Sequence, residues 1–302
     1  MKRRTFVQSV SLGTLGLGCP SFMTSTKAPS GLKISLTPWS LIRAGYGGDD
    51  PNGMSVFDFP KAAKNLGFDY IDHEMFHLPK PLKDEHLELM NSRCKAASVK
   101  SAVLLTGGAG DLGDADKSER KKALNKYQYW IDVAAALNCK AMRNVCADFI
   151  TISYDEKLKY TAEGVYELGI YAKSKGIDLL IENHNGYTSD PEWLAQLMEK
   201  VNLSNVGVLG DFSNWRIKNN PEVNYPNPYK GIEILAPYIR AVSAKSEEFT
   251  PSGEESRIDY KKMLAILKKA PQLEFAGVEF FGTKIPRNQG ATLTKDLIEK
   301  YW

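Results

Sequence analysis

The sequence predicts an α/β protein that folds as one (β/α)8 TIM barrel over residues 27–302. Eight short apolar runs follow one another along the chain, with centres roughly 30–40 residues apart, which is the length of one βα unit. Longer amphipathic stretches separate these runs. Eight such units fill the length of a (β/α)8 barrel, typically about 250 residues. The chain has 302 residues, 43% of them hydrophobic and 25% charged, as expected of a folded protein.

The eight apolar runs are the expected strands. In chain order they are Lys33–Trp39, Tyr70–Met75, Val99–Thr106, Ala141–Cys146, Asp178–His184, Val206–Phe212, Ile239–Ser246 and Phe275–Phe281. Apolar residues between the runs recur at helical spacing. This spacing predicts helices over Phe57–Leu66, Lys122–Leu137, Tyr160–Lys175, Pro191–Lys200 and Tyr260–Lys269. Gly176 is expected to end the third of them.

The alternative fold is an open, doubly wound parallel sheet, which usually carries a glycine-rich phosphate loop after its first strand. Here Pro38-Trp39-Ser40 follows the first strand, and the glycines at 107–110 do not form that motif either. No proline- or glycine-rich linker divides the chain. We interpret the proline-rich stretch Pro221–Tyr229 as a long loop after a strand, which favours a single barrel.

Residues 1–26 are predicted to be an export signal. Basic residues at positions 2–4 precede a short apolar stretch, 10–18, and no acidic residue occurs before position 27. The run Arg3–Val7 resembles a twin-arginine (Tat) signal, which exports folded proteins. Cys19 follows a segment that resembles a lipoprotein cleavage box. The two destinations left open are the periplasm and a lipid-anchored membrane lipoprotein.

The charge of the chain bears on its partners. The formal charge of +3 comes from 39 basic and 36 acidic residues, and the leader holds the whole excess. A neutral domain has little attraction for nucleic-acid phosphates, so we expect no nucleic-acid partner. No later segment is long and apolar enough to predict a membrane span. The sequence leaves a homo-oligomer open.

Three predicted strands end with a carboxylate, namely Glu182, Asp211 and Glu279. Barrel enzymes hold their chemistry at these carboxyl ends of the strands. A carboxylate in an apolar strand is costly to bury unless it is paired or binds a metal. Three that converge would repel one another, and a divalent cation with oxygen ligands, Mg²⁺ or Mn²⁺, would relieve this. Salt bridges to lysine or arginine are the alternative.

The motifs at these strand ends resemble those of the sugar phosphate isomerase/epimerase family, within the xylose isomerase-like TIM barrel superfamily. The matching segments are Ile181–Gly186, Asp211–Asn214, Ala244–Ser246 and Val278–Gly282. The resemblance spans essentially the whole chain after the leader. It implies a divalent metal held by a glutamate, an aspartate, a histidine and a glutamate from strands five to eight. Glu182, Asp211 and Glu279 match three of these four ligands.

The fourth ligand position departs from the family pattern, because Ser243 stands where the family commonly has histidine. A hydroxyl is a weaker ligand than an imidazole, so this departure bears on whether a metal binds at all. His184 is the candidate substitute ligand, its alternative role being a buried structural histidine. Ser243 is then assigned to substrate binding. Lys245 would bind a substrate hydroxyl or carboxylate, supply positive charge in place of a metal, or pair with a strand-end carboxylate.

Further substrate contacts are expected from His73 and Glu74 at the end of the second strand and from Arg143 in the fourth. The first two could instead be ordinary polar side chains on the protein surface, and the arginine could instead form a buried ion pair. Aromatic residues at strand ends are expected to stack on a sugar ring, with loop packing as the alternative. They are Trp39, Phe76 and Trp215.

The resemblance implies proton transfer next to a carbonyl, with Glu182 and Glu279 as the acid/base pair and the metal stabilising an enediolate. This predicts a sugar isomerase or epimerase. The same enolate could expel a substituent, as in a lyase acting on a 3-keto-glycoside or inosose. Export argues against a phosphorylated substrate. Endonuclease IV chemistry is disfavoured because the chain has only four histidines. A non-catalytic sugar-binding barrel stays open because of Ser243.

Overall fold

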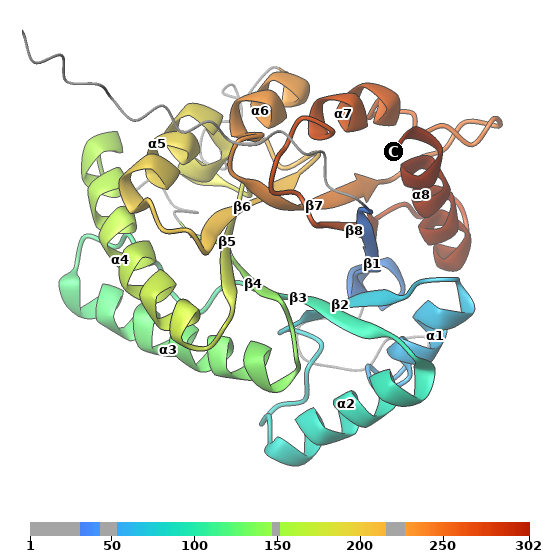
Figure 1. The fold of residues 1–302 in the computed structure, drawn as a ribbon, viewed down its shortest axis with the longest axis horizontal. Coiled ribbons are helices and arrows are strands. Elements are labelled where there is room, and N and C mark those ends of the chain that lie inside the picture. Colours follow the sequence, from blue (N-terminus) through green and yellow to red (C-terminus); the bar gives the residue numbers. More distant parts are fainter. Residues whose placement is uncertain (1–30, 43–52, 147–151, 216–226) are drawn as a thin grey trace, which may run out of the picture.

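Eight parallel strands, within the part of the chain that the structure describes, pair in chain order and close into a barrel in which the last pairs with the first. The structure is a computed structural model, and it describes residues 31–42, 53–146, 152–215 and 227–302. The helices form an outer ring around the strands (Figure 1). The predicted (β/α)8 TIM barrel is therefore confirmed. The predicted leader, with Cys19, lies outside the described residues.

The strands are short and overlap all eight predicted runs. They are β1 (Lys33–Leu36), β2 (Tyr70–Glu74), β3 (Lys100–Thr106), β4 (Ala141–Asn144), β5 (Asp178–Glu182), β6 (Val206–Asp211), β7 (Ile239–Ser246) and β8 (Phe275–Phe280). Short 3-10 turns follow β1 and β5, and they are η1 (Pro38–Ser40) and η2 (Gly186–Ser189).

The helices follow the strands in strict alternation. They are α1 (Phe59–Asn65), α2 (Asp84–Ala97), α3 (Lys117–Ala136), α4 (Tyr154–Ser174), α5 (Pro191–Val201), α6 (Pro228–Leu235), α7 (Tyr260–Leu267) and α8 (Arg287–Tyr301). Pro228 and Tyr229 begin α6, so the loop predicted over 221–229 ends earlier than expected, and its residues 221–226 lie outside the described ranges. None of the helices described is both long and apolar enough to cross a membrane.

Local chemistry explains where the helices begin and end. Asp116, Ser153 and Asp190 precede α3, α4 and α5, and each side chain accepts a hydrogen bond from a backbone N–H of the first turn. Such caps satisfy donors that have no partner inside the helix. Gly176 follows α4 with a φ of +72°, a left-handed conformation that glycine adopts without strain. This confirms the predicted helix end.

Alternation along each strand separates two cores. Side chains on the outer face pack against the helices in the larger core. Inner-face residues on the amino-terminal side of the strand-end acids, among them Leu180, Leu209 and Phe275, form a smaller apolar cluster. Side chains on one face of a strand recur at every second residue. Glu182 and Asp211 therefore share the inner face with Leu180 and Leu209, two residues closer to the carboxyl end. The barrel interior therefore changes from apolar to charged toward its carboxyl end.

A buried ion pair fixes the loop after β3. The Lys157 ammonium in α4 has no exposed surface and contacts the Asp111 carboxylate, which is itself mostly buried. Asp111 lies in the same loop as Gly107 and Gly108, which line the barrel mouth. This pair therefore connects the stability of the fold to the shape of the mouth.

We predict that Asp111→Ala destabilises the protein by about 3–5 kcal/mol, because it leaves a fully buried ammonium without its partner. Adding Lys157→Met should recover most of this loss, since it removes the charge and keeps the side-chain length. Urea unfolding of the two variants measures both effects. As a control, Asp69→Ala, which breaks an exposed pair with Lys64, should cost less than about 1 kcal/mol. Equal losses in Asp111→Ala and Asp69→Ala would contradict the prediction.

Candidate active site

The carboxyl ends of the strands open onto two adjoining cavities of about 450 and 440 Å³. We call the first the carboxylate cavity, because Glu74, Glu182 and Glu279 line it together with Arg143. We call the other the second cavity. Both are lined by four shared residues, which are His184, Asn214, Lys245 and Phe281. Both cavities lie at the carboxyl ends of the strands, where barrel enzymes bind their substrates.

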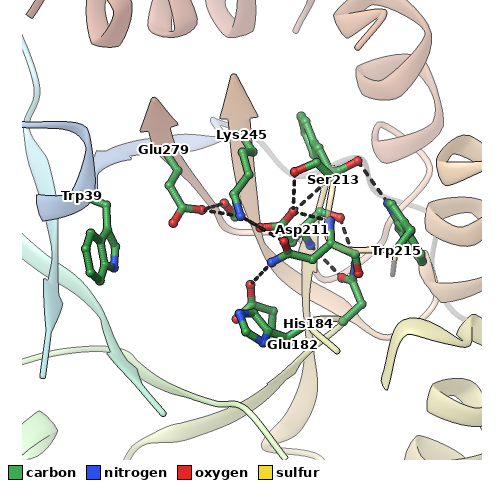
Figure 2. A network of polar contacts seen from close by, with 12 residues as sticks. Trp39, Glu182, His184, Asp211, Ser213, Trp215, Lys245 and Glu279 are labelled. Atoms are coloured by element: carbon green, nitrogen blue, oxygen red, sulfur yellow. Dashed lines mark hydrogen bonds and ion pairs between the residues drawn. The ribbon is translucent and has the colours of Figure 1, made fainter. Parts of the chain in front are cut away.

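Lys245 in β7 lies at the centre of the polar network (Figure 2). Its Nζ is 2.8 Å from Asp211 Oδ2 and 3.6 Å from Glu279 Oε2. It also donates to Asn214 Oδ1 at 3.2 Å and lies 5.2 Å from the ring centre of Phe281. Strand register sets part of this geometry, because Lys245 and Glu279 are paired neighbours across β7 and β8.

Arg143 in β4 offsets the negative charge of Glu182 and Glu74 on the other side of the mouth. Its Nε is 3.0 Å from Glu182 Oε2, and its Nη2 is 3.6 Å from Glu74 Oε2. The guanidinium also donates to the backbone carbonyl of Thr106 at 2.7 Å, which fixes its orientation. Trp39 donates its indole N–H to Glu74 at 3.0 Å. Every carboxylate of this half of the mouth thus contacts a donor of the chain.

Neutral polar residues complete the network. Ser243 donates a hydrogen bond to Glu279, and Asn214 donates to Glu182 at 3.1 Å. Asp211 accepts backbone hydrogen bonds from Ser213 at 2.7 Å and Asn214 at 2.9 Å, so the carboxylate shapes the turn after β6. Asn214 thereby joins Glu182 to Lys245. Sequence reasoning missed this role, although Asn214 lies in the motif that follows β6.

Burial controls the protonation of the acids. It raises the pKa of Glu182 above its ordinary value, and the charge of Arg143 opposes this only in part. Burial likewise raises the pKa of Glu74 from 4.5 to about 7, again against Arg143. Asp72, which lines a small cavity beneath the mouth, also has its pKa raised by burial to about 7. Several acids here can therefore hold a proton near neutral pH.

The carboxylates affect Lys245 in the opposite sense. Burial alone lowers the pKa of its ammonium, but Asp211, Glu279 and Glu182 together raise it by more, so the net direction is upward. The side chain therefore keeps its positive charge at neutral pH.

The structure brings most of the predicted site residues together. Glu182, Asp211, Glu279, Lys245 and Arg143 meet in one network. Glu74 and Trp39 line the carboxylate cavity, whereas Trp215 lines only the second cavity. His184 lines both, and its ring Nδ1 lies 2.6 Å from the Asn185 amide nitrogen.

His73 is placed elsewhere, which corrects its assignment to substrate binding. It alternates with Asp72 and Glu74 along β2, so its side chain lies on the opposite face and contacts the Ser101 hydroxyl at 2.8 Å. It is buried there, and burial lowers its pKa to about 4. The sequence already indicated this placement, because adjacent residues of a strand point to opposite faces. Glu74 and His73 therefore cannot both face the barrel interior.

The donor set does not fit the divalent metal that the family resemblance implies. Among the described residues, no three His, Cys, Asp or Glu side chains are grouped as a metal site. Glu182 contacts Arg143, and Asp211 and Glu279 contact Lys245. The expected histidine position holds Ser243, whose hydroxyl is directed to Glu279.

Comparison with models of known protein families shows to which family the chain belongs. Residues 60–301 match the family described as xylose isomerase-like TIM barrel, so the chain belongs to that family. No curated protein matches the chain in the corresponding sequence comparison.

Several solved structures share the fold. A D-psicose 3-epimerase from Clostridium cellulolyticum H10, solved with D-tagatose, is 14% identical, with a TM-score of 0.70 over 89% of this chain and 99% of that chain. A 3-keto-D-glucoside 4-epimerase from E. coli is 13% identical, with a TM-score of 0.65 over 88% and 99%. A family member from Mycobacterium smegmatis in complex with magnesium is 17% identical, with a TM-score of 0.62 over 88% and 98%.

We predict that protonation of Glu74 makes stability depend on pH. Its pKa in the folded protein, about 7, lies above the ordinary 4.5, so the folded state binds more protons than the unfolded chain between these values. The free energy of unfolding therefore falls as pH rises through this window. Between pH 5 and 8, wild type should lose about 1–3 kcal/mol more than Glu74→Gln in urea unfolding.

Asp72 titrates over the same range in both proteins, so the difference between them isolates Glu74. Glutamine can keep the acceptor for the Trp39 indole, which makes the variant a close structural match. Parallel pH profiles for the two proteins would show that Glu74 is already ionised at pH 5.

Proposed function

We propose that the protein is a sugar isomerase or epimerase that moves a proton at the carbon next to a carbonyl. One observation carries this proposal. Glu182 from β5 and Glu279 from β8 line the same cavity from different sides of the barrel, with cationic side chains against both. Two carboxylates that flank one bound carbon are the arrangement that proton removal and return require.

In the proposed reaction a keto sugar binds in the carboxylate cavity with the acidic carbon between the two glutamates. One carboxylate takes the proton, the electron pair of the broken C–H bond forms a C=C bond, and the π pair of the carbonyl passes to its oxygen. The second carboxyl group returns a proton to the opposite face, which inverts the centre. Return of the proton to the former carbonyl carbon, with transfer of the neighbouring hydroxyl proton to the first carbonyl oxygen, would instead isomerise the sugar. Burial raises the pKa of Glu182, which favours the protonated form that can return a proton to the substrate.

The substrate proposed is a free keto sugar or keto-glycoside. Trp39 and Phe281 stack at 6.2 Å between ring centres beside the cavity, and such surfaces suit the apolar face of a sugar ring. The second cavity, lined by Trp215 and Arg257, gives room for a second group beyond the reacting ring. The similar fold of a 3-keto-D-glucoside 4-epimerase supports this class. It also keeps a lyase acting on a 3-keto-glycoside as the second candidate.

We also propose that residues 1–26 direct export, as a Tat-like signal or, with Cys19, a lipoprotein signal. Support comes from the basic residues followed by an apolar stretch. An exported enzyme would meet unphosphorylated sugars, in agreement with a free keto sugar as substrate.

We predict that the wild-type protein incorporates solvent deuterium into a ketose or 3-keto-glycoside at the carbon next to the carbonyl. Glu182→Gln and Glu279→Gln should each lower the exchange rate by about 10²–10⁴-fold, because an amide can neither take nor return the proton. Mass spectrometry of the recovered sugar measures the exchange, and NMR identifies any epimer or elimination product.

The matched control is Glu274→Gln, which alters the glutamate directly before β8, at the opposite end of the barrel from Glu279, where it pairs with Lys33. This variant should exchange at the wild-type rate. If the wild-type protein catalysed neither exchange nor elimination on any keto sugar tested, the proposed function would be contradicted. A non-catalytic sugar-binding barrel would then be favoured.

A further inference from the structure

The position of Lys245 has a consequence for the chemistry of the mouth, given the proposed function. Its ammonium lies between Asp211 and Glu279, at 2.8 and 3.6 Å, and Asn214 holds it from a third side at 3.2 Å. Only 13% of the side chain is exposed, so water screens these contacts weakly. The ammonium therefore occupies the space among the carboxylates that any bound cation would need.

A divalent cation would have to displace these contacts. Mg²⁺ requires octahedral oxygen ligation, usually by one or two carboxylates whose lone pairs point at the ion, together with water. Here Asp211 and Glu279 direct oxygens at Lys245, and Glu182 directs one at Arg143 at 3.0 Å. A cation added among them would also be repelled by the nearby ammonium. The ligand set and the charge both oppose it.

Ser243 points to the same conclusion by independent evidence. It stands at the family's histidine position, two residues before Lys245 on the same face of β7. Its hydroxyl donates to Glu279 Oε2, which leaves that oxygen directed at the chain's own donors. The residue thus reinforces a hydrogen-bonded carboxylate and provides no imidazole.

Lys245 also reaches the place where substrate would lie. It lines both the carboxylate cavity and the second cavity, and its charge lies beside the Phe281 ring. An ammonium has three N–H donors that reorient freely, so it can turn one of them to a new oxyanion while the others keep Asp211 and Asn214. Arg143 is less suited, because its carbonyl contact with Thr106 and its carboxylate contacts fix it.

We infer that Lys245 is the catalytic residue that stabilises the enolate oxygen, so that the reaction proceeds without a bound divalent metal. When a carboxylate removes the proton, the C–H electron pair forms a C=C bond, the carbonyl π pair moves to oxygen, and Lys245 donates a hydrogen bond to the resulting oxyanion. Return of a proton to carbon restores the carbonyl and frees the ammonium. All atoms and electrons are accounted for within the substrate and the two carboxyl groups.

The first test measures metal binding without reference to activity. The purified full-length protein is treated with EDTA, dialysed and titrated with Mn²⁺, and bound metal is counted by calorimetry and by loss of the free Mn²⁺ EPR signal. Wild type should bind none at the mouth. The double variant Ser243→His, Lys245→Met should bind one Mn²⁺ per chain, because it supplies an imidazole and removes the ammonium.

Two results would overturn the inference. One is stoichiometric Mn²⁺ binding by wild type that Asp211→Asn abolishes. The other is a double variant that binds no more Mn²⁺ than wild type, which would show that Lys245 is not what excludes the cation. Asp69→Asn, directly before β2 and so at the opposite end of the strands from the mouth, is the matched control for general loss of acidic charge.

The second test uses deuterium exchange. Wild-type exchange should persist in EDTA, and Lys245→Met should lower kcat by about 10²–10³-fold, as when an oxyanion donor is lost. Lys245→Arg, which keeps the charge among the carboxylates, should retain more activity and serves as the check on folding. If EDTA abolished wild-type exchange and Mn²⁺ restored it, the inference would be contradicted and the proposed function would stand. No exchange by wild type would instead remove the proposed function, and the binding test would still decide the metal question.

Discussion

Charge balance at the barrel mouth is the constraint on which the rest of the site depends. Acids from β2, β5, β6 and β8 converge where water is partly excluded, and their mutual repulsion would be costly if all were ionised and unpaired. Two buried cations, Arg143 and Lys245, offset this charge from opposite sides. The acids are Glu74, Glu182, Asp211 and Glu279.

The barrel itself enforces this meeting of charges. Closure brings β7 beside β8, and their register sets Lys245 opposite Glu279, as the β6–β7 register sets Asp211 opposite Ser243. The apolar cluster below the mouth, with Leu180 among its members, closes the interior toward the other end of the barrel. Chemistry is therefore confined to the open end, and a change at one strand end alters the electrostatic surroundings of its neighbours.

The strands and the strand-end acids could be predicted from the sequence because both depend on local patterns. Apolar runs at regular spacing indicate strands, and Glu182 or Asp211 is conspicuous within such a run. Pairing across the barrel could not be predicted in the same way. The choice of Arg143 as the partner of Glu182, and the bridge through Asn214, depend on side-chain direction and strand register. The prediction that His73 contacts substrate was wrong for a local reason. Strict alternation of side chains along β2 places it on the face opposite to Glu74.

A lysine and a metal ion would place different demands on the substrate. A divalent ion polarises a carbonyl strongly and can ligate two sugar oxygens at once, whereas the Lys245 ammonium brings one charge and a hydrogen bond. With the weaker electrophile, the proton to be removed must already be acidic, as it is next to a ketone in an oxidised sugar. On the role inferred for Lys245, the Ser243 hydroxyl and the central ammonium would suit a keto sugar, whose carbonyl makes the neighbouring proton acidic. Substrate class and charge balance are, on this argument, one property of the same barrel mouth.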